Sequence, residues 1–307
     1  MKLKLKTAAI LLAVSTSTYV FSQTDPINVV TTAVPFLRIS PDARSGSMGD
    51  LGIATTPDAN SPFWNQAKIP FAQSKNAVSL TYTPWLKDLG VNDVYLASLS
   101  GYHQLDEQSA ISASLRYFNL GSIQFTDFSG NPISTGKPTE LGVDVGYSRK
   151  LSSKLGLGVA LRYINSNLTR GYASSNGVSY KAGNAVAGDV SLYYDMSKEN
   201  GEGWRFGAAL SNLGSKISYT NDAQQKDYIP ANFGIGATYT KVIDPVNKIM
   251  FGIDINKLMV PTPPVAKYDP NNPNDAAHAA IRDMKRAIFN TDGQPDVKLG
   301  GKVKEIE

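Results

Sequence analysis

The chain of 307 residues contains no cysteine, and it has two histidines and no apolar run long enough to cross a bilayer as a helix. The lack of cysteine excludes disulfides, thiolate metal sites and a lipid-modified cysteine behind a signal peptide. His103 and His278 lie far apart, with no second ligand at a metal-binding spacing. No Gly-x-Ser-x-Gly elbow accompanies a histidine, and Asp106 and Glu107 are typical of a solvated turn. We therefore expect no enzyme activity, no metal and no cofactor.

Positive charge is also scarce once the first residues are set aside. The net charge of +4 includes Lys2, Lys4 and Lys6. Removing these three from the 30 Lys and Arg leaves 27 against 26 Asp and Glu, a net charge near +1. No basic cluster remains that would indicate a nucleic-acid partner.

The same three lysines open a secretory signal. They precede a short apolar run, Ala8–Val14, and Val20 and Ser22 are small enough to flank a cleavage site before Gln23. The sequence therefore predicts that residues 1–22 are a cleaved signal peptide and that the chain is exported.

Most of the remaining chain alternates apolar and polar residues with a period of two, which is typical of strands with two different faces. The alternating segments are 78–83, 95–100, 111–117, 141–148, 155–163, 186–194, 204–211, 233–240 and 249–256. Segments of about ten residues match tilted strands that cross a membrane. The sequence predicts an all-β protein with about nine strands.

The composition of the two faces separates a membrane barrel from a secreted β-sandwich. The polar face is mostly Gly, Ser, Ala and Thr with single Asp or Arg residues, whereas the outer face of a soluble sandwich is rich in Lys, Glu and Thr. The apolar face repeatedly ends in tyrosine, as an interfacial girdle requires. These tyrosines are Tyr82, Tyr117, Tyr147, Tyr163, Tyr194 and Tyr239. We predict a transmembrane antiparallel β-barrel over residues 76–307.

The connections between the strands alternate in length, as in outer-membrane proteins with short periplasmic turns and long extracellular loops. Residues 149–153 form a short turn, whereas 126–138 and 169–183 are long and rich in Gly, Ser and Asn. A Pro/Asn-rich arm and a helical pattern predict an extracellular insertion at 260–295. Its candidate partner-binding residues are Pro261, Pro263, Pro264, Ile281, Met284 and Ile288. The alternative is a lid that only shields the barrel mouth.

The last residues begin like a strand and stop at Glu307 without the aromatic residue that usually ends a closing strand. An open sheet edge in lipid would leave backbone groups unsatisfied, at several kcal/mol each. We therefore expect that the barrel is truncated at its C-terminus.

A segment before the first strand is neither a strand pattern nor an amphipathic helix. Residues 32–50 thread two charge pairs, Arg38 with Asp42 and Arg44 with Asp50, among prolines and small residues. Charges in a membrane protein are usually paired inside it, so residues 23–75 are predicted to form a plug in the barrel lumen. The four charges could act as a functional latch or simply seat the plug.

Two motifs in this region resemble the N-terminal signature of the FadL-like (long-chain fatty-acid transporter) barrel superfamily. The first is Ala43–Asp50 followed by Gly-Ile-Ala, and the second is Pro57-Asp58-Ala59-Asn60 followed by Phe63–Ala67. Gln66 stands where the signature usually has proline. Trp64 and Asn65 could line a ligand pocket, or the tryptophan could pack at the periplasmic rim while the asparagine caps a turn.

A more specific stretch, Ala33–Arg44, closely resembles the PorV (LptO) family of the type IX secretion system. The similarity continues through Tyr82–Leu86 and Leu115–Phe118. The resemblance implies a barrel of fourteen strands, which fits the expected truncation.

The resemblance also implies a function that composition does not show. Proteins of this family are non-enzymatic outer-membrane barrels that dock on a giant translocon barrel and bind the C-terminal signal domain of exported cargo. They pass the cargo to an attachment complex with a sortase-like protease, which anchors it to lipopolysaccharide. The alternatives are a FadL-type importer of hydrophobic small molecules and a porin-like structural barrel. An apolar tunnel through the lumen would favour the importer, and a plugged polar lumen with an apolar extracellular rim would favour the cargo receptor.

Overall fold

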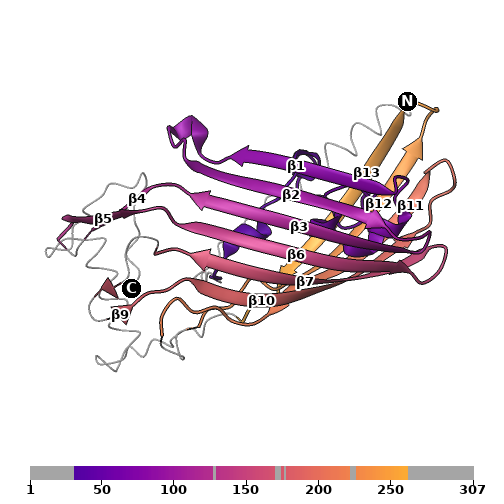
Figure 1. Cartoon of the computed structure of the whole chain (residues 1–307). Coiled ribbons are helices and arrows are strands. Elements are labelled where there is room, and N and C mark those ends of the chain that lie inside the picture. The colour runs from indigo at the N-terminus through magenta and orange to yellow at the C-terminus, as the bar shows by residue number, and fades with distance from the viewer. Residues whose placement is uncertain (1–30, 127–128, 170–173, 176–177, 222–225, 262–307) are drawn as a thin grey trace, which may run out of the picture. The chain divides into compact units, whose positions relative to one another are not determined.

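In the part of the chain that the structure describes, nine long strands form one antiparallel sheet in which each strand pairs with the next long strand along the chain (Figure 1). The computed structural model describes residues 31–126, 129–169, 174–175, 178–221 and 226–261, which belong to one unit, Thr31–Pro261. The strands are β1 (Asn76–Pro84), β2 (Val94–Gln104), β3 (Ser109–Leu120), β6 (Thr139–Lys150), β7 (Leu155–Asn167), β10 (Gly183–Asp195), β11 (Gly203–Gly214), β12 (Asn232–Val242) and β13 (Lys248–Leu258). Each alternating segment of the sequence lies within one of these strands, so the all-β prediction is confirmed. In the described part, β1 and β13 are the two edges of the sheet.

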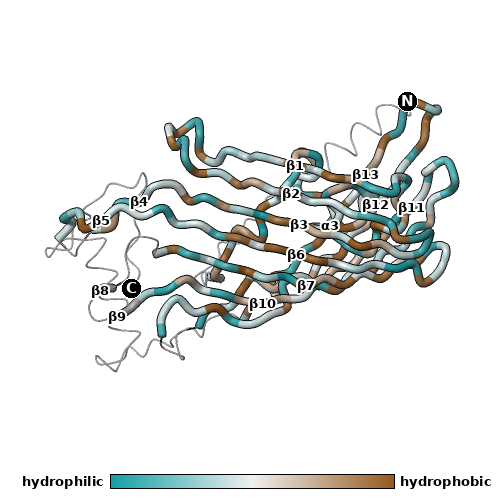
Figure 2. Tube along the Cα trace, in the orientation of Figure 1, coloured by the Kyte–Doolittle hydropathy of each residue, from teal (hydrophilic) through white to brown (hydrophobic). Residues whose placement is uncertain are grey.

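The polarity of this sheet is the reverse of that in a soluble protein. On the face that we call the inner face, Arg116 and Asp144 are 1% and 2% exposed. On the opposite, outer face, Leu80 and Leu161 are 77% and 65% exposed. Figure 2 shows the resulting alternation of hydrophobic and hydrophilic residues along each strand. A sheet that buries charge and exposes leucine requires apolar surroundings on its outer face, as a membrane provides.

The connections at the two ends of the sheet differ in length, as predicted. At one end, the short-loop end, the strands are joined by residues 105–108, 151–154, 196–202 and 243–247. At the other, the long-loop end, they are joined by 85–93, 121–138, 168–182 and 215–231. Two of the long connections contain short hairpins, β4 (Ile123–Thr126) with β5 (Pro132–Gly136) and β8 (Ser174–Ser175) with β9 (Val178–Ser179).

The short turns are held by side chains that replace backbone partners. Asp106 accepts hydrogen bonds from the backbone N–H groups of Gln108 and Ser109, both at 2.7 Å. Asp244 accepts in the same way from Val246 and Asn247 at 2.9 and 2.7 Å. Asp and Ser favour such turns because their short side chains reach the backbone two or three residues ahead. The local sequence therefore specifies where each strand reverses at this end.

The N-terminal segment lies against the inner face of the sheet. Its helices are η1 (Pro35–Arg38), α2 (Ala43–Ser47), α3 (Ser61–Trp64) and η2 (Gln66–Phe71). Phe36 of η1 packs in a cluster with Leu96, near the long-loop end of β2, whereas Ile69 of η2 packs with Tyr102, near its short-loop end. The segment therefore runs along the inner face from one end to the other. Among the helices described, none is long and apolar enough to cross a membrane.

Both edge strands of the sheet contact this segment. The Thr81 hydroxyl on β1 donates to the Pro41 carbonyl oxygen at 2.6 Å. On β13, the Asp254 carboxylate accepts from the Gly52 backbone N–H at 2.8 Å. The sheet is therefore wrapped around residues 31–75, which we call the plug segment.

Candidate functional site

Asp42 joins the two halves of the plug motif. It is the N-cap of α2, where its Oδ1 accepts from the Ser45 backbone N–H at 2.8 Å. Its Oδ2 accepts from the indole Nε1–H of Trp64 at 2.9 Å. The indole in turn lies against Gly52, where a Cβ atom would overlap the ring. Asp42, Gly52 and Trp64 thus form one interlocked contact, which explains why the motif needs glycine and tryptophan together.

Arg44 pairs with a different partner from the one that the sequence suggested. It forms an ion pair with Asp58, and it donates to the Thr56 carbonyl oxygen at 3.2 Å and the Thr56 hydroxyl at 2.7 Å. The expected pairing with Asp50 is wrong because Asp50 follows the end of α2 with φ 61°, where its backbone N–H returns to the Ser45 carbonyl oxygen. The expected pairing of Asp42 with Arg38 is also replaced, since the Asp42 carboxylate serves α2 and Trp64.

Gly52 is held at both of its backbone groups. Its N–H, and that of Ile53, donate to Asp254 Oδ2 at 2.8 and 2.9 Å. Its carbonyl oxygen accepts from Lys68 Nζ at 2.7 Å, and the same amine donates to Thr55 Oγ1 at 3.1 Å. The Lys68 side chain is fully buried, and this burial lowers its pKa to about 8. A buried cation and a carboxylate from the far edge of the sheet therefore fix the same peptide.

Asn65 caps η2 and ties the plug segment to the wall. Its Oδ1 accepts from the Ala67 backbone N–H at 2.9 Å, as a turn-capping asparagine does. Its Nδ2 donates to the carbonyl oxygens of Ile53 and Leu192, both at 2.9 Å. Beside it, a Cβ on Gly158 of β7 would come within 2.6 Å of the Ala67 nitrogen. The glycines of the inner face thus provide room for the backbone of η2.

A ladder of alternating charges, which the sequence did not predict, crosses the inner face. Arg116 and Asp144 lie 3.4 Å apart, Arg162 pairs with the same carboxylate, and Arg162 Nη2 lies 2.9 Å from Asp189. The four residues stand on β3, β6, β7 and β10. Their signal was the single Asp or Arg on the polar face of each strand, but the sequence alone did not give their register. Two cations and two anions balance, as buried charges in a membrane protein require.

The ladder also contacts the plug segment. Arg116 Nη1 donates to the Leu37 carbonyl oxygen at 3.1 Å. Its guanidinium lies 4.9 Å from the centre of the Phe63 ring, a cation–π contact. The charges of the wall therefore hold η1 and α3 as well as one another.

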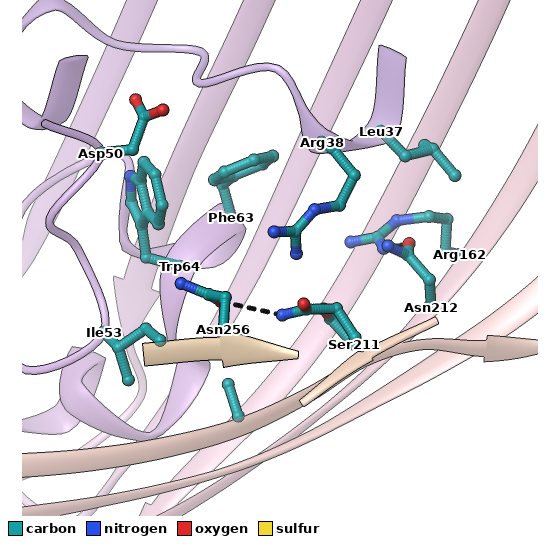
Figure 3. A pocket seen from close by; sticks show the side chains of 12 residues that line it. Leu37, Arg38, Asp50, Ile53, Phe63, Trp64, Arg162, Ser211, Asn212 and Asn256 are labelled. Carbon is teal, nitrogen blue, oxygen red and sulfur yellow. Dashed lines mark hydrogen bonds between the residues drawn. The ribbon is translucent and has the colours of Figure 1, made fainter. Parts of the chain in front are cut away.

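A small polar cavity remains between the plug segment and the wall (Figure 3). Arg38 extends toward it from η1, and burial lowers the pKa of this guanidinium while the Asp50 carboxylate opposes the shift. On the wall, Asn232 Nδ2 donates to Asn256 Oδ1 at 2.9 Å. The cavity of about 80 Å³ is below the roughly 150 Å³ of a protein cavity that binds benzene, so it has room for a few waters only.

The two histidines and the candidate partner-binding residues lie elsewhere. His103 is exposed on the outer face beside Asn76, and His278 lies outside the described residues. The part of the chain that the structure describes holds no group of three or more His, Asp or Glu side chains able to bind a metal ion. Pro261 is exposed at the end of the described part. The other candidate partner-binding residues, Pro263, Pro264, Ile281, Met284 and Ile288, lie outside it, as does the predicted signal peptide.

Comparison with solved structures gives distant likenesses. The Pseudomonas putida toluene transporter TodX is 14% identical, with 68% of each chain covered and a TM-score of 0.43. A TodX deltaS2S3 mutant monoaromatic hydrocarbon channel is 14% identical, with 67% of each chain covered and a TM-score of 0.41. The Ralstonia pickettii toluene transporter TbuX is 13% identical, with 59% of this chain and 55% of the other covered and a TM-score of 0.22.

Comparison with protein families is decisive. No curated protein matches the chain. A family model described as "Type IX secretion system protein PorV" matches residues 21–265, which include the plug segment and all nine long strands. The match agrees with the resemblance carried by Ala33–Arg44 and with a sheet whose outer face is apolar, as in an outer-membrane protein. The chain therefore belongs to the PorV family of type IX secretion system proteins.

Proposed function

We propose that this chain is a non-enzymatic outer-membrane component of the type IX secretion system that binds the C-terminal signal domain of exported cargo. In this proposal it receives cargo at the giant translocon barrel and passes it to the sortase-like attachment complex, which anchors it to lipopolysaccharide. Membership of the PorV family supports the system. The apolar surface at the long-loop end supports the binding role.

The observation that carries the proposal is a set of exposed apolar side chains beyond the ends of the strands. The connection after β1 contains η3 (Lys87–Leu89), and its Leu86 and Leu89 are 49% and 77% exposed. The β4–β5 hairpin adds exposed Ile123 and Ile133 at the same end of the sheet. Exposed apolar residues gathered on loops are typical of protein-binding sites.

The geometry of the η3 turn presents these leucines rigidly. Leu86 adopts φ 57°, a conformation that is uncommon for a residue other than glycine, and Gly90 follows with φ 82°. The backbone N–H of Leu89 donates to the Leu86 carbonyl oxygen at 3.0 Å. A turn held in this conformation presents the leucines with little loss of entropy when a partner binds.

The interior supports a cargo receptor over an importer of hydrophobic small molecules. An importer needs an apolar passage, whereas the described inner face carries the charge ladder and the plug segment, and the small cavity between them is lined by Arg38, Asp50 and Arg162 as well as by apolar side chains. Cargo would then bind on the loops, which is where function concentrates in barrels whose strands face lipid.

The experiment is a pull-down of the tagged full-length protein from outer membranes, read by mass spectrometry. Wild-type protein should recover a very large barrel and secreted proteins that share a C-terminal domain. A variant with Leu86→Ser and Leu89→Ser should lose the secreted proteins. Leu151→Ser, which is 57% exposed in a turn at the short-loop end, is the matched control and should retain them. Recovery of only a lone barrel with bound fatty acid from wild-type membranes would contradict the proposal and favour the importer.

A further inference from the structure

The outer face of the sheet carries an apolar groove across β1, β2, β3 and β6. Its volume is about 720 Å³, and its walls are Val78, Leu99, Ile111, Leu115, Val143 and Val145. The strand register explains the hollow. Gly101 is paired with Ala113, and these two small residues lie between Val78 on β1 and Val145 on β6. Because Gly101 has no side chain and Ala113 has only a methyl group, the floor of the groove is lower than the valines on either side.

The groove has room for part of one acyl chain. Along β3 its walls run from Ile111 to Leu115, and at about 3.4 Å per residue this is roughly 14 Å along the strand. Apolar walls next to an unfilled space lose their dispersion contacts, and a flexible hydrocarbon chain restores them.

Charged groups of both signs stand at the short-loop end of the groove. His103 lines the groove there. Arg149, on β6, is paired with Ser109 in the register of β3. The Ser109 hydroxyl donates to Asp106 Oδ2 at 2.7 Å, and this hydrogen bond is the main cause of the lowered pKa of Asp106, to which the positive charge of Arg149 adds. Arg149 and Asp106 therefore both lie beside Ser109 at this end of the groove.

We propose that this groove binds one zwitterionic glycerophospholipid, with an acyl chain along Gly101 and Ala113 and the phosphate beside Arg149. The headgroup amine faces the carboxylates of the 105–108 turn. Arginine binds phosphate through two parallel N–H donors, and the acidic turn complements the ammonium group. This site does not depend on the cargo-binding role. It depends only on an outer face that lies in the membrane.

The test is native mass spectrometry of the full-length protein, extracted in mild detergent and titrated with phosphatidylethanolamine. Wild-type protein should retain one lipid. Ala113→Leu fills the floor of the groove and should weaken retention roughly tenfold, the equivalent of about 1.4 kcal/mol. Ala237→Leu, which places the same side chain on the outer face of β12 away from the groove, is the matched control and should bind like wild type.

A second variant addresses the headgroup and does not alter the floor of the groove. Arg149→Gln should reduce retention of phosphatidylethanolamine, and the reduction should be smaller at high salt because the phosphate contact is already screened there. Equal retention in Ala113→Leu and Ala237→Leu would overturn the proposal. So would preferential retention of lipopolysaccharide, or a protein subunit occupying this face in the wild type.

Discussion

Because of Lys68, we expect the free energy of unfolding to rise as the pH rises above about 8. The amine is fully buried against the Gly52 carbonyl oxygen, and burial lowers its pKa from 10.5 to about 8. Below about pH 8 both the folded and the unfolded protein carry the proton, so the folded state bears the full desolvation cost. Between about 8 and 10.5 the folded protein loses the proton while the unfolded chain keeps it, and unfolding then takes up a proton. The free energy of unfolding should therefore rise with pH across this window.

The size of the effect follows from the shift in pKa. At about 1.4 kcal/mol for each pH unit, the rise approaches roughly 3 kcal/mol by pH 10.5. The assay is urea unfolding of the detergent-solubilised protein at about pH 7 and at about pH 10, followed by tryptophan fluorescence. Lys68→Met removes the titrating amine, so its difference from wild type isolates the contribution of Lys68 from other groups that titrate in this range.

Lys154→Met is the control, because this lysine is exposed in the 151–154 turn and no contact with the plug segment involves it in the described part of the chain. Its free energy of unfolding should follow wild type at both pH values. If wild type and Lys68→Met change in parallel with pH, Lys68 does not carry a buried charge and our reading of its environment is refuted.

Two further predictions concern how the plug segment is seated. Gly158→Ala should expose the segment to limited proteolysis, because its Cβ would come within 2.6 Å of the Ala67 nitrogen, whereas Gly188→Ala has 3.5 Å to its nearest neighbour and should remain resistant. Equal cleavage of the two variants would contradict the close fit. Trp64→Phe should lower the free energy of unfolding by about 2 kcal/mol, because it removes the indole hydrogen bond to the Asp42 carboxylate. Urea unfolding measures this loss, and an unchanged midpoint would show that the bond does not hold the plug segment.

The strands could be predicted from the sequence because their signal is local. The alternation of apolar and small or polar residues in Leu155–Tyr163 predicts, within a few residues, both that the segment is a strand and which of its residues share a face. The short turns are equally local, since Asp106 and Asp244 form hydrogen bonds only to their own turns. The family signature was also readable, because it lies in one contiguous stretch.

The contacts of the plug segment could not be predicted in the same way. Asp254 reaches Gly52 from about two hundred residues away, and nothing near either residue marks the pair. The charge pairs suggested by proximity in the sequence were wrong for a related reason. A helix cap and an indole each take one oxygen of the Asp42 carboxylate, and the indole contact depends on how α2 and α3 pack together. The predicted 260–295 insertion stays a prediction.

The contacts of the plug segment with both edges of the sheet have a consequence for how the protein is made. Thr81 on β1 and Asp254 on β13 bind the same segment, which is synthesised before either strand. The contacts of the plug segment are therefore complete only when the last described strand has formed, which gives the fold a high contact order. We expect the strands to assemble around this segment, which links the two edges of the sheet once β13 is in place.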